Sequence, residues 1–167
     1  MQKEAKEKIK KLVERYDKLN KKDVRSYDET RTKQHFIRPM FEALGWDFLG
    51  EDVWQEKDVQ GKRVDYAFMI NGITKFFVEA KSLKTDLDLE IHIKQAVNYA
   101  WNKGVTWAVL TDFEAIKVFN AQTQSKIFQD KLVFEIKYFE FLKDFDRLRL
   151  LSGESFLNNE LDKYAEK

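Results

Sequence analysis

No cysteine occurs in this chain of 167 residues, and His35 and His92 are its only histidines. Disulfide bonds and thiolate metal sites are therefore excluded, and two histidines are too few for a histidine-rich zinc or iron site. Any metal ion would be held mainly by oxygen atoms, which favours magnesium, manganese or calcium.

The chain also lacks an excess of one charge and a long apolar run. Its 30 basic and 29 acidic residues leave a formal net charge of +1, so composition alone does not point to a polyanion such as nucleic acid. No segment approaches the roughly 20 apolar residues that cross a bilayer. The charged N-terminus lacks the apolar core of a signal peptide. We expect a soluble, cytoplasmic protein with no membrane partner.

Material for a hydrophobic core, in contrast, is plentiful. Hydrophobic residues make up 43% and aromatic residues 14% of the sequence, which a disordered chain would not carry. The length fits one domain. We expect a single domain over residues 1–167, with an N-terminal helix and linker (1–25), a central core (26–136) and a C-terminal helical segment (137–167).

Apolar spacing predicts two helices near the N-terminus. Residues 2–19 form an amphipathic helix, and residues 20–25 form a polar break. A second helix begins near Ser26 in a capping box, is kinked at Pro39 and stops at Gly45.

Strand patterns dominate the middle of the chain. Residues 63–70 and 73–81 flank Asn71-Gly72, a strong hairpin signal. Both strands carry apolar residues on both faces, so we expect helices on either side of the sheet. The other expected elements are a strand region after Trp46, a helix over 88–102, strands over 106–111 and 115–120, and a helical tail from Tyr138 with a break at Ser152-Gly153. This α-α-β-β-β-α-β-β-α order predicts one mixed α/β domain.

Two charged residues share one strand face. Glu79 and Lys81 are two positions apart, so their side chains leave the same side of the sheet. A plain two-residue turn would place Asp65 on the opposite face from Glu79. A three-residue loop over 70–72, with Gly72 left-handed in a bulge, places Asp65 on the same face. A site that uses both carboxylates requires this second register or an equivalent bulge elsewhere.

Two carboxylates on one face repel each other unless a cation lies between them or one is protonated. Asp65, Glu79 and the backbone carbonyl of Ala80 could hold Mg²⁺, which polarises a phosphate and acidifies a water molecule, while Lys81 orients or activates that water. The alternative is a set of solvated salt bridges on an exposed strand face.

Four motifs, in order along residues 26–156, resemble one nuclease family. Asp65, thirteen intervening residues and then 79–81 (Glu-Ala-Lys) resemble the core of the PD-(D/E)xK nuclease superfamily, although Val64 replaces the usual proline. Residues 95–99 resemble the Q-x-x-x-Y element of a branch that includes helicase-linked nucleases and the N-terminal domains of type I restriction enzyme R subunits. Two further segments, 29–47 and 139–152, resemble the opening helix and the closing segment of those restriction domains.

The resemblance implies a restriction-endonuclease-like fold, a mixed β-sheet flanked by helices, and a Mg²⁺-dependent DNA endonuclease in which Mn²⁺ can substitute. Asp65, Glu79 and the Ala80 carbonyl would bind the metal, and Lys81 would orient or activate the attacking water molecule. Glu29 and Gln95 would support this site. Such a chain would be the cleavage module of a type I or type IIG restriction enzyme. Its partners would be DNA and the motor, methyltransferase or specificity domains or subunits.

Several residues have a structural alternative. Glu29 would face the metal pocket by resemblance, but it could merely complete the Ser26 capping box. Tyr99 could support the site or pack against the sheet. Candidate contacts to the DNA backbone are Lys62, Arg63, Lys84, Lys94 and Tyr99, and for each basic residue the alternative is a solvated side chain. Two other functions also remain: an inactive DNA-binding or assembly module, or a stand-alone nuclease for branched DNA or RNA.

Overall fold

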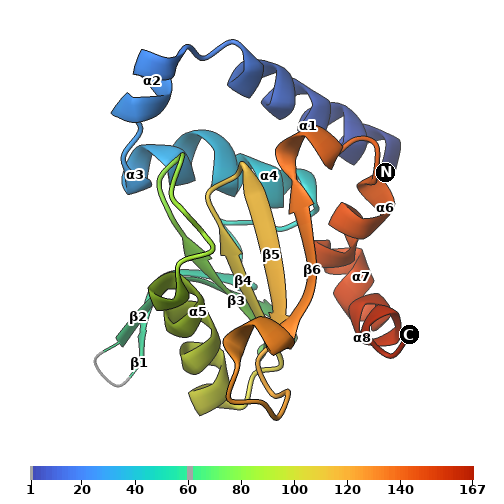
Figure 1. Cartoon of the computed structure of the whole chain (residues 1–167). Helices are drawn as coiled ribbons and strands as arrows, with labels where there is room; N and C mark the ends of the chain where they lie inside the picture. The colour runs from blue at the N-terminus through green and yellow to red at the C-terminus, as the bar shows by residue number, and fades with distance from the viewer. Residues whose placement is uncertain (1, 60–61) are drawn as a thin grey trace.

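The computed structural model describes the backbone of residues 2–59 and 62–167 and the side chains of 2–56 and 63–167 (Figure 1). Its strands are β1 (Val53–Val59), β2 (Lys62–Ile70), β3 (Ile73–Ala80), β4 (Trp107–Thr111), β5 (Ala115–Asn120) and β6 (Leu132–Lys137). Its α-helices are α1 (Gln2–Asp17), α2 (Lys21–Ser26), α3 (Glu29–Thr32), α4 (Arg38–Ala43), α5 (Glu90–Lys103), α6 (Phe145–Leu148), α7 (Gly153–Leu157) and α8 (Glu160–Ala165). A π-helical stretch, η1 (Lys33–Ile37), joins α3 to α4, and short 3₁₀ turns are η2 (Phe128–Lys131), η3 (Tyr138–Glu140) and η4 (Arg149–Leu151).

The six strands form one mixed sheet in the order β1-β2-β3-β4-β5-β6. β3 and β4 run parallel and the other neighbours antiparallel. Two parallel strands need a long crossover connection, and α5 supplies it. The predicted mixed α/β fold is confirmed, although β6 was not expected.

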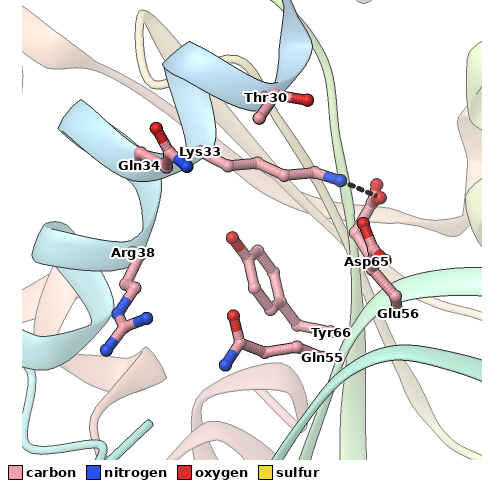
Figure 2. Close-up of a pocket in the computed structure, with 8 residues that line it drawn as sticks. All are labelled: Thr30, Lys33, Gln34, Arg38, Gln55, Glu56, Asp65 and Tyr66. Carbon is pink, nitrogen blue, oxygen red and sulfur yellow. Dashed lines mark hydrogen bonds and ion pairs between the residues drawn. The ribbon is translucent and has the colours of Figure 1, made fainter.

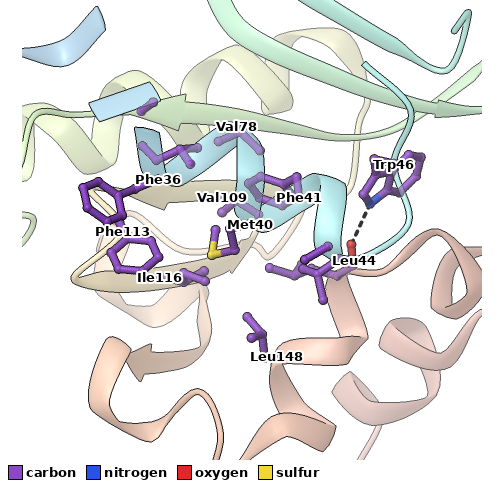
Figure 3. Packing of buried hydrophobic residues seen from close by; sticks show 14 of the residues in the cluster. Phe36, Met40, Phe41, Leu44, Trp46, Val78, Val109, Phe113, Ile116 and Leu148 are labelled. Atoms are coloured by element: carbon purple, nitrogen blue, oxygen red, sulfur yellow. Dashed lines mark hydrogen bonds between the residues drawn. The ribbon is translucent and has the colours of Figure 1, made fainter. Parts of the chain in front are cut away.

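Helices cover both faces of the sheet, as the strand pattern predicts. On one face, Ile93, Val97 and Ala100 of α5 pack with Phe77 and Leu110. On the other face, α1, η1, α4 and the C-terminal helices enclose a larger core, part of which is drawn in Figure 3. No helix in the described part of the chain is both long enough and apolar enough to cross a membrane.

The C-terminal helices are tied to the larger core. Trp46, just after α4, donates from its indole Nε1 to the carbonyl of Leu151 at 2.9 Å (Figure 3). Phe76 of β3 stacks between Phe68, at 4.5 Å between ring centroids, and Phe156 of α7, at 4.7 Å. Aromatic pairs at this separation add to the free energy of area burial.

The second predicted helix begins later than expected. Residues 20–25 are not a break, because Asn20 and Asp23 form a capping box that starts α2. Ser26 ends this helix. The next helix is capped by Asp28, whose side chain accepts from the backbone N–H of Arg31 at 2.8 Å. The capping box predicted at Ser26 is therefore wrong.

Pro39 disturbs the second helix one turn earlier than its own position. A proline cannot donate a backbone hydrogen bond, and its ring crowds the carbonyl four residues before it. The helix accommodates this by widening into η1, closed by a hydrogen bond from the Arg38 N–H to the Lys33 carbonyl. The helix then ends at Ala43, and Gly45, two residues later, has a φ of +97° that fits the predicted stop.

Candidate active site

Asp65 and Glu79 lie on one face of the sheet, but not through the predicted loop. β2 and β3 pair Ile70 with Ile73 across a two-residue turn, so the three-residue loop over 70–72 is wrong. The turn is tight because both of its residues adopt positive φ, which asparagine and glycine tolerate best.

A β-bulge supplies the shift of register instead. Met69 pairs with Thr74 and Phe68 with Phe76, which leaves Lys75 as an extra residue. Beyond the bulge Tyr66 faces Val78, and the next position along each strand is Asp65 and Glu79. The prediction that the two carboxylates share a face is confirmed through the equivalent bulge that it allowed.

Asp65 is fixed between a backbone amide and an ammonium group. Its Oδ2 accepts from the Ala80 N–H at 2.7 Å. Its Oδ1 accepts from Lys33 Nζ, the contact drawn in Figure 2. The side chain is only 12% exposed. Its position is therefore set by groups on three elements: β2, β3 and η1.

Glu79 is a buried carboxyl group beside a second acid. It is 6% exposed. Burial, and then the negative charge of Asp65, raise the pKa of Glu79 to about 8, although the Lys81 ammonium opposes this. Without a bound cation the group therefore holds its proton near neutral pH, because the pocket cannot accommodate two negative charges.

Lys81 is oriented from both sides of the site. Its Nζ lies 3.6 Å from Glu79 Oε1 and donates to Gln95 Oε1 at 3.0 Å. Gln95 projects from α5, the helix that covers this face of the sheet. The resemblance implies only that Gln95 supports the site, and the structure places it beside Lys81.

Lys33 is the residue of this site that the sequence did not single out. Besides Asp65, it contacts Glu29 Oε1 at 3.4 Å. Burial alone would lower the pKa of Lys33, but the hydrogen bond and charge of Asp65, with Glu29, raise it above its usual value. The four-residue spacing of Glu29 and Lys33 was the only signal in the sequence.

Comparison with known proteins indicates a similarity to restriction enzymes. Residues 50–127 match the family model described as the type I restriction enzyme R protein N terminus. The matched segment contains Asp65, Glu79, Lys81 and Gln95. The chain resembles the N-terminal domain of type I restriction enzyme R proteins.

A restriction enzyme with a second activity supports this resemblance. Over 171 aligned residues the chain is 26% identical to the "Type II restriction enzyme and methyltransferase RM.Eco57I" of Escherichia coli. The alignment covers 89% of this chain and 17% of that protein. No solved structure matches the chain.

The restriction-enzyme resemblance implies a metal ion, and the donors fit one in part. Within the described residues, no group of three or more His, Cys, Asp and Glu side chains could hold a metal ion. Asp65 and Glu79 nevertheless bring two carboxyl groups to one buried spot. Asp65 is paired there with the ammonium of Lys33, and the pKa of Glu79 is raised. Oxygen donors of this kind suit Mg²⁺, which keeps several waters and needs only one or two carboxylates.

Glu29 lies at the edge of this group. It is the first residue of α3 rather than a partner of Ser26, so the capping alternative is wrong. Its carboxylate is 45% exposed and turns towards Lys33. Its role towards a metal stays a prediction.

Tyr99 lies in the core. It is buried on α5, and its ring packs edge-on against Phe77 at 4.8 Å between centroids. This is the packing position that the sequence left open as the alternative. A contact between Tyr99 and DNA stays a prediction.

The basic candidates lie at the surface and form ion pairs where they are described. Arg63, Lys84 and Lys94 are each at least half exposed. Their partners are Glu56 at 4.0 Å, Glu114 at 3.2 Å and Glu90 at 3.2 Å, respectively. The side chain of Lys62 lies outside the described residues. DNA contacts by these four residues stay predictions.

Proposed function

We propose that this chain is the DNA-cleavage module of a restriction-modification system, a Mg²⁺-dependent endonuclease. One observation carries the proposal: Asp65, Glu79 and Lys81 meet on one sheet face, in the segment that matches the restriction family. Mn²⁺ would substitute for Mg²⁺. The motor, methyltransferase or specificity parts would belong to other domains or subunits, since the chain spans only 17% of its restriction-enzyme relative.

The residues divide the chemistry between them. Bound Mg²⁺ would neutralise the two carboxylates and polarise the scissile phosphate. Asp65, Glu79 and the Ala80 carbonyl would hold it, and the Ala80 N–H keeps Asp65 in place for that purpose. Lys81, held by Gln95 and Glu79, would orient the attacking water molecule. A lysine that is 13% exposed can donate to this water while bulk solvent is largely excluded.

A divalent-metal titration with different nucleic acids tests the proposal. Linear, nicked and branched duplexes, single-stranded DNA and RNA would each be incubated with the chain and Mg²⁺, Mn²⁺ or Ca²⁺. We expect DNA cleavage with Mg²⁺ and Mn²⁺ but not with Ca²⁺, whose looser coordination activates water poorly. Binding without cleavage under every metal would favour an inactive DNA-binding module. Cleavage confined to RNA or to branched DNA would favour a stand-alone nuclease.

A further inference from the structure

A cavity of about 390 Å³ opens beside the carboxylate pair, between η1 and the strands β1 and β2 (Figure 2). Asp65 forms part of its wall, so the cavity adjoins the candidate active site. The size is within the range of small-ligand sites, roughly 300–1,000 Å³. Such sites are usually lined by apolar residues, whereas every residue that lines this one carries a polar side chain. The cavity is therefore suited to a polar ligand.

Positive charge is concentrated on the helical side of the cavity. Lys33 and Arg38 project into it from η1 and the start of α4, whereas the two acids of the wall, Asp65 and Glu56, lie on the strand side (Figure 2). Because the ammonium of Lys33 is already paired with Asp65, the guanidinium of Arg38 is the cation best placed for an anionic ligand. Gln34 and Gln55 add neutral amide donors to the wall.

The π-helical stretch is the reason that Lys33 and Arg38 line the same cavity. In a regular α-helix of 3.6 residues per turn, side chains five positions apart point in different directions. Here the hydrogen bond from the Arg38 N–H to the Lys33 carbonyl spans five residues, which places the two side chains one wide turn apart. Pro39 favours this wide turn, so the sequence places Lys33 and Arg38 on one wall of the cavity.

Arg38 forms one long ion pair and one ring contact. Its guanidinium lies over the ring of Phe48, at 5.2 Å from the centroid, and its Nε is 3.7 Å from the exposed carboxylate of Glu42. Neither contact is a hydrogen bond from the two terminal Nη groups, which can donate together to a phosphate. Burial raises the pKa of the nearby Tyr66 hydroxyl, which therefore remains protonated and can donate a hydrogen bond.

We propose that this cavity binds the phosphodiester backbone of the DNA strand next to the scissile bond, with Arg38 as its phosphate ligand and Gln34 and Gln55 as supporting donors. The inference rests on the proposed function. It also predicts that the DNA strand approaches the site along η1 rather than across α5, the helix that carries Lys94.

Binding of a fluorescein-labelled DNA duplex in Ca²⁺, followed by anisotropy, tests Arg38. We expect Arg38→Gln to weaken binding by about tenfold and to lower the slope of log affinity against log salt by about one, because one phosphate contact is lost. Arg15→Gln is the matched control, since Arg15 also lies over a phenylalanine ring, at 4.9 Å from Phe36, but outside the cavity. Equal affinities and equal slopes for the two variants would overturn the proposal.

Gln34 provides a test that does not depend on the packing of Arg38. The residue is exposed, so Gln34→Lys and Gln34→Glu should both fold normally. We expect the lysine variant to bind DNA more tightly and the glutamate variant more weakly, each by several-fold. The opposite order, or no difference, would contradict a phosphate at this place.

The failure of this inference can be told apart from failure of the proposed function. A wild-type chain that binds no DNA in Ca²⁺ would count against both. Binding that Arg38→Gln and the Gln34 variants leave unchanged, together with Mg²⁺-dependent cleavage, would overturn the cavity alone. As a further readout, a divalent ion should raise the melting temperature of the wild-type chain, because it binds only the folded state. Arg38→Gln should keep this rise, and Glu79→Gln should lose it.

Discussion

At the scale of single residues, burial decides how the candidate site behaves. Glu79 is the clearest case, because the sheet encloses it and Asp65 adds a negative charge beside it. The protein balances these charges with Lys33 on one side and Lys81 on the other. Sequence spacing predicted the two acids and Lys81. It could not predict Lys33, whose direction depends on the π-helical stretch.

The raised pKa of Glu79 leads to a prediction about stability and pH. A carboxyl group with a folded pKa of about 8 stays protonated while the unfolded chain has already ionised, at a pKa near 4.5. The unfolded state then binds fewer protons, so the free energy of unfolding should fall as pH rises from about 4.5 to 8. Glu79→Gln removes this loss and should stabilise the metal-free protein at pH 8 by on the order of 1–3 kcal/mol.

Thermal unfolding of the metal-free chain at several pH values measures this effect. Each 1 kcal/mol corresponds to about 2–4 °C for a chain of this size. The exposed Glu166 serves as control, and Glu166→Gln should leave the profile unchanged. Asp112, a second buried acid whose pKa burial raises to about 7, keeps part of the slope in both variants. A Glu79→Gln protein with the wild-type profile would show that Glu79 is ionised in the folded state.

At the scale of elements, strong local patterns predicted more than weak ones. β5 was predicted with its observed ends, and β2, β3 and α5 within about two residues, because their apolar runs are bounded by turns. α2 escaped prediction because it buries one residue, Val24, and owes its start to the Asn20 cap. β6 escaped as well, although its buried Phe134 and Ile136 alternate with Glu135 and Lys137, a signal that could have revealed it.

The hairpin gives a prediction at the same scale. Gly72 adopts a φ of +79°, which costs other residues about 1–2 kcal/mol. Gly72→Ala should therefore lower the free energy of unfolding by about 1 kcal/mol. It should leave DNA cleavage intact, because the bulge at Lys75 lies between the turn and Glu79.

Urea unfolding and a cleavage assay check the two parts of that expectation. Gly153→Ala is the matched control, since Gly153 opens α7 without a positive φ and an added methyl group would meet only the Gly45 carbonyl oxygen at 3.8 Å. That change should be neutral or slightly stabilising. Loss of cleavage in a folded Gly72→Ala protein would mean that the turn, and not the bulge, sets the register of the site.

At the scale of the whole molecule, a mixed sheet covered on both faces places a polar site at one end of its central strands. Asp65 comes from β2, Glu79 from β3, Gln95 from α5 and Lys33 from η1, so four segments must pack correctly before the site exists. The order of motifs along the sequence predicted that Asp65, Glu79 and Gln95 meet, but not that Lys33 joins them. The register itself depends on the bulge at Lys75. The position of this bulge follows from core packing on both sides of β3, and no local sequence pattern encodes that packing.

The most direct test of the central claim is cleavage of DNA by variants of the carboxylate–lysine group. Glu79→Gln and Lys81→Ala would be compared with the wild-type chain and with Lys126→Ala, an exposed lysine away from the site. Circular dichroism would establish that all four proteins are folded. We predict Mg²⁺-dependent cleavage by the wild type and by Lys126→Ala, and its loss in the other two. Cleavage by folded Lys81→Ala at the wild-type rate would contradict the account.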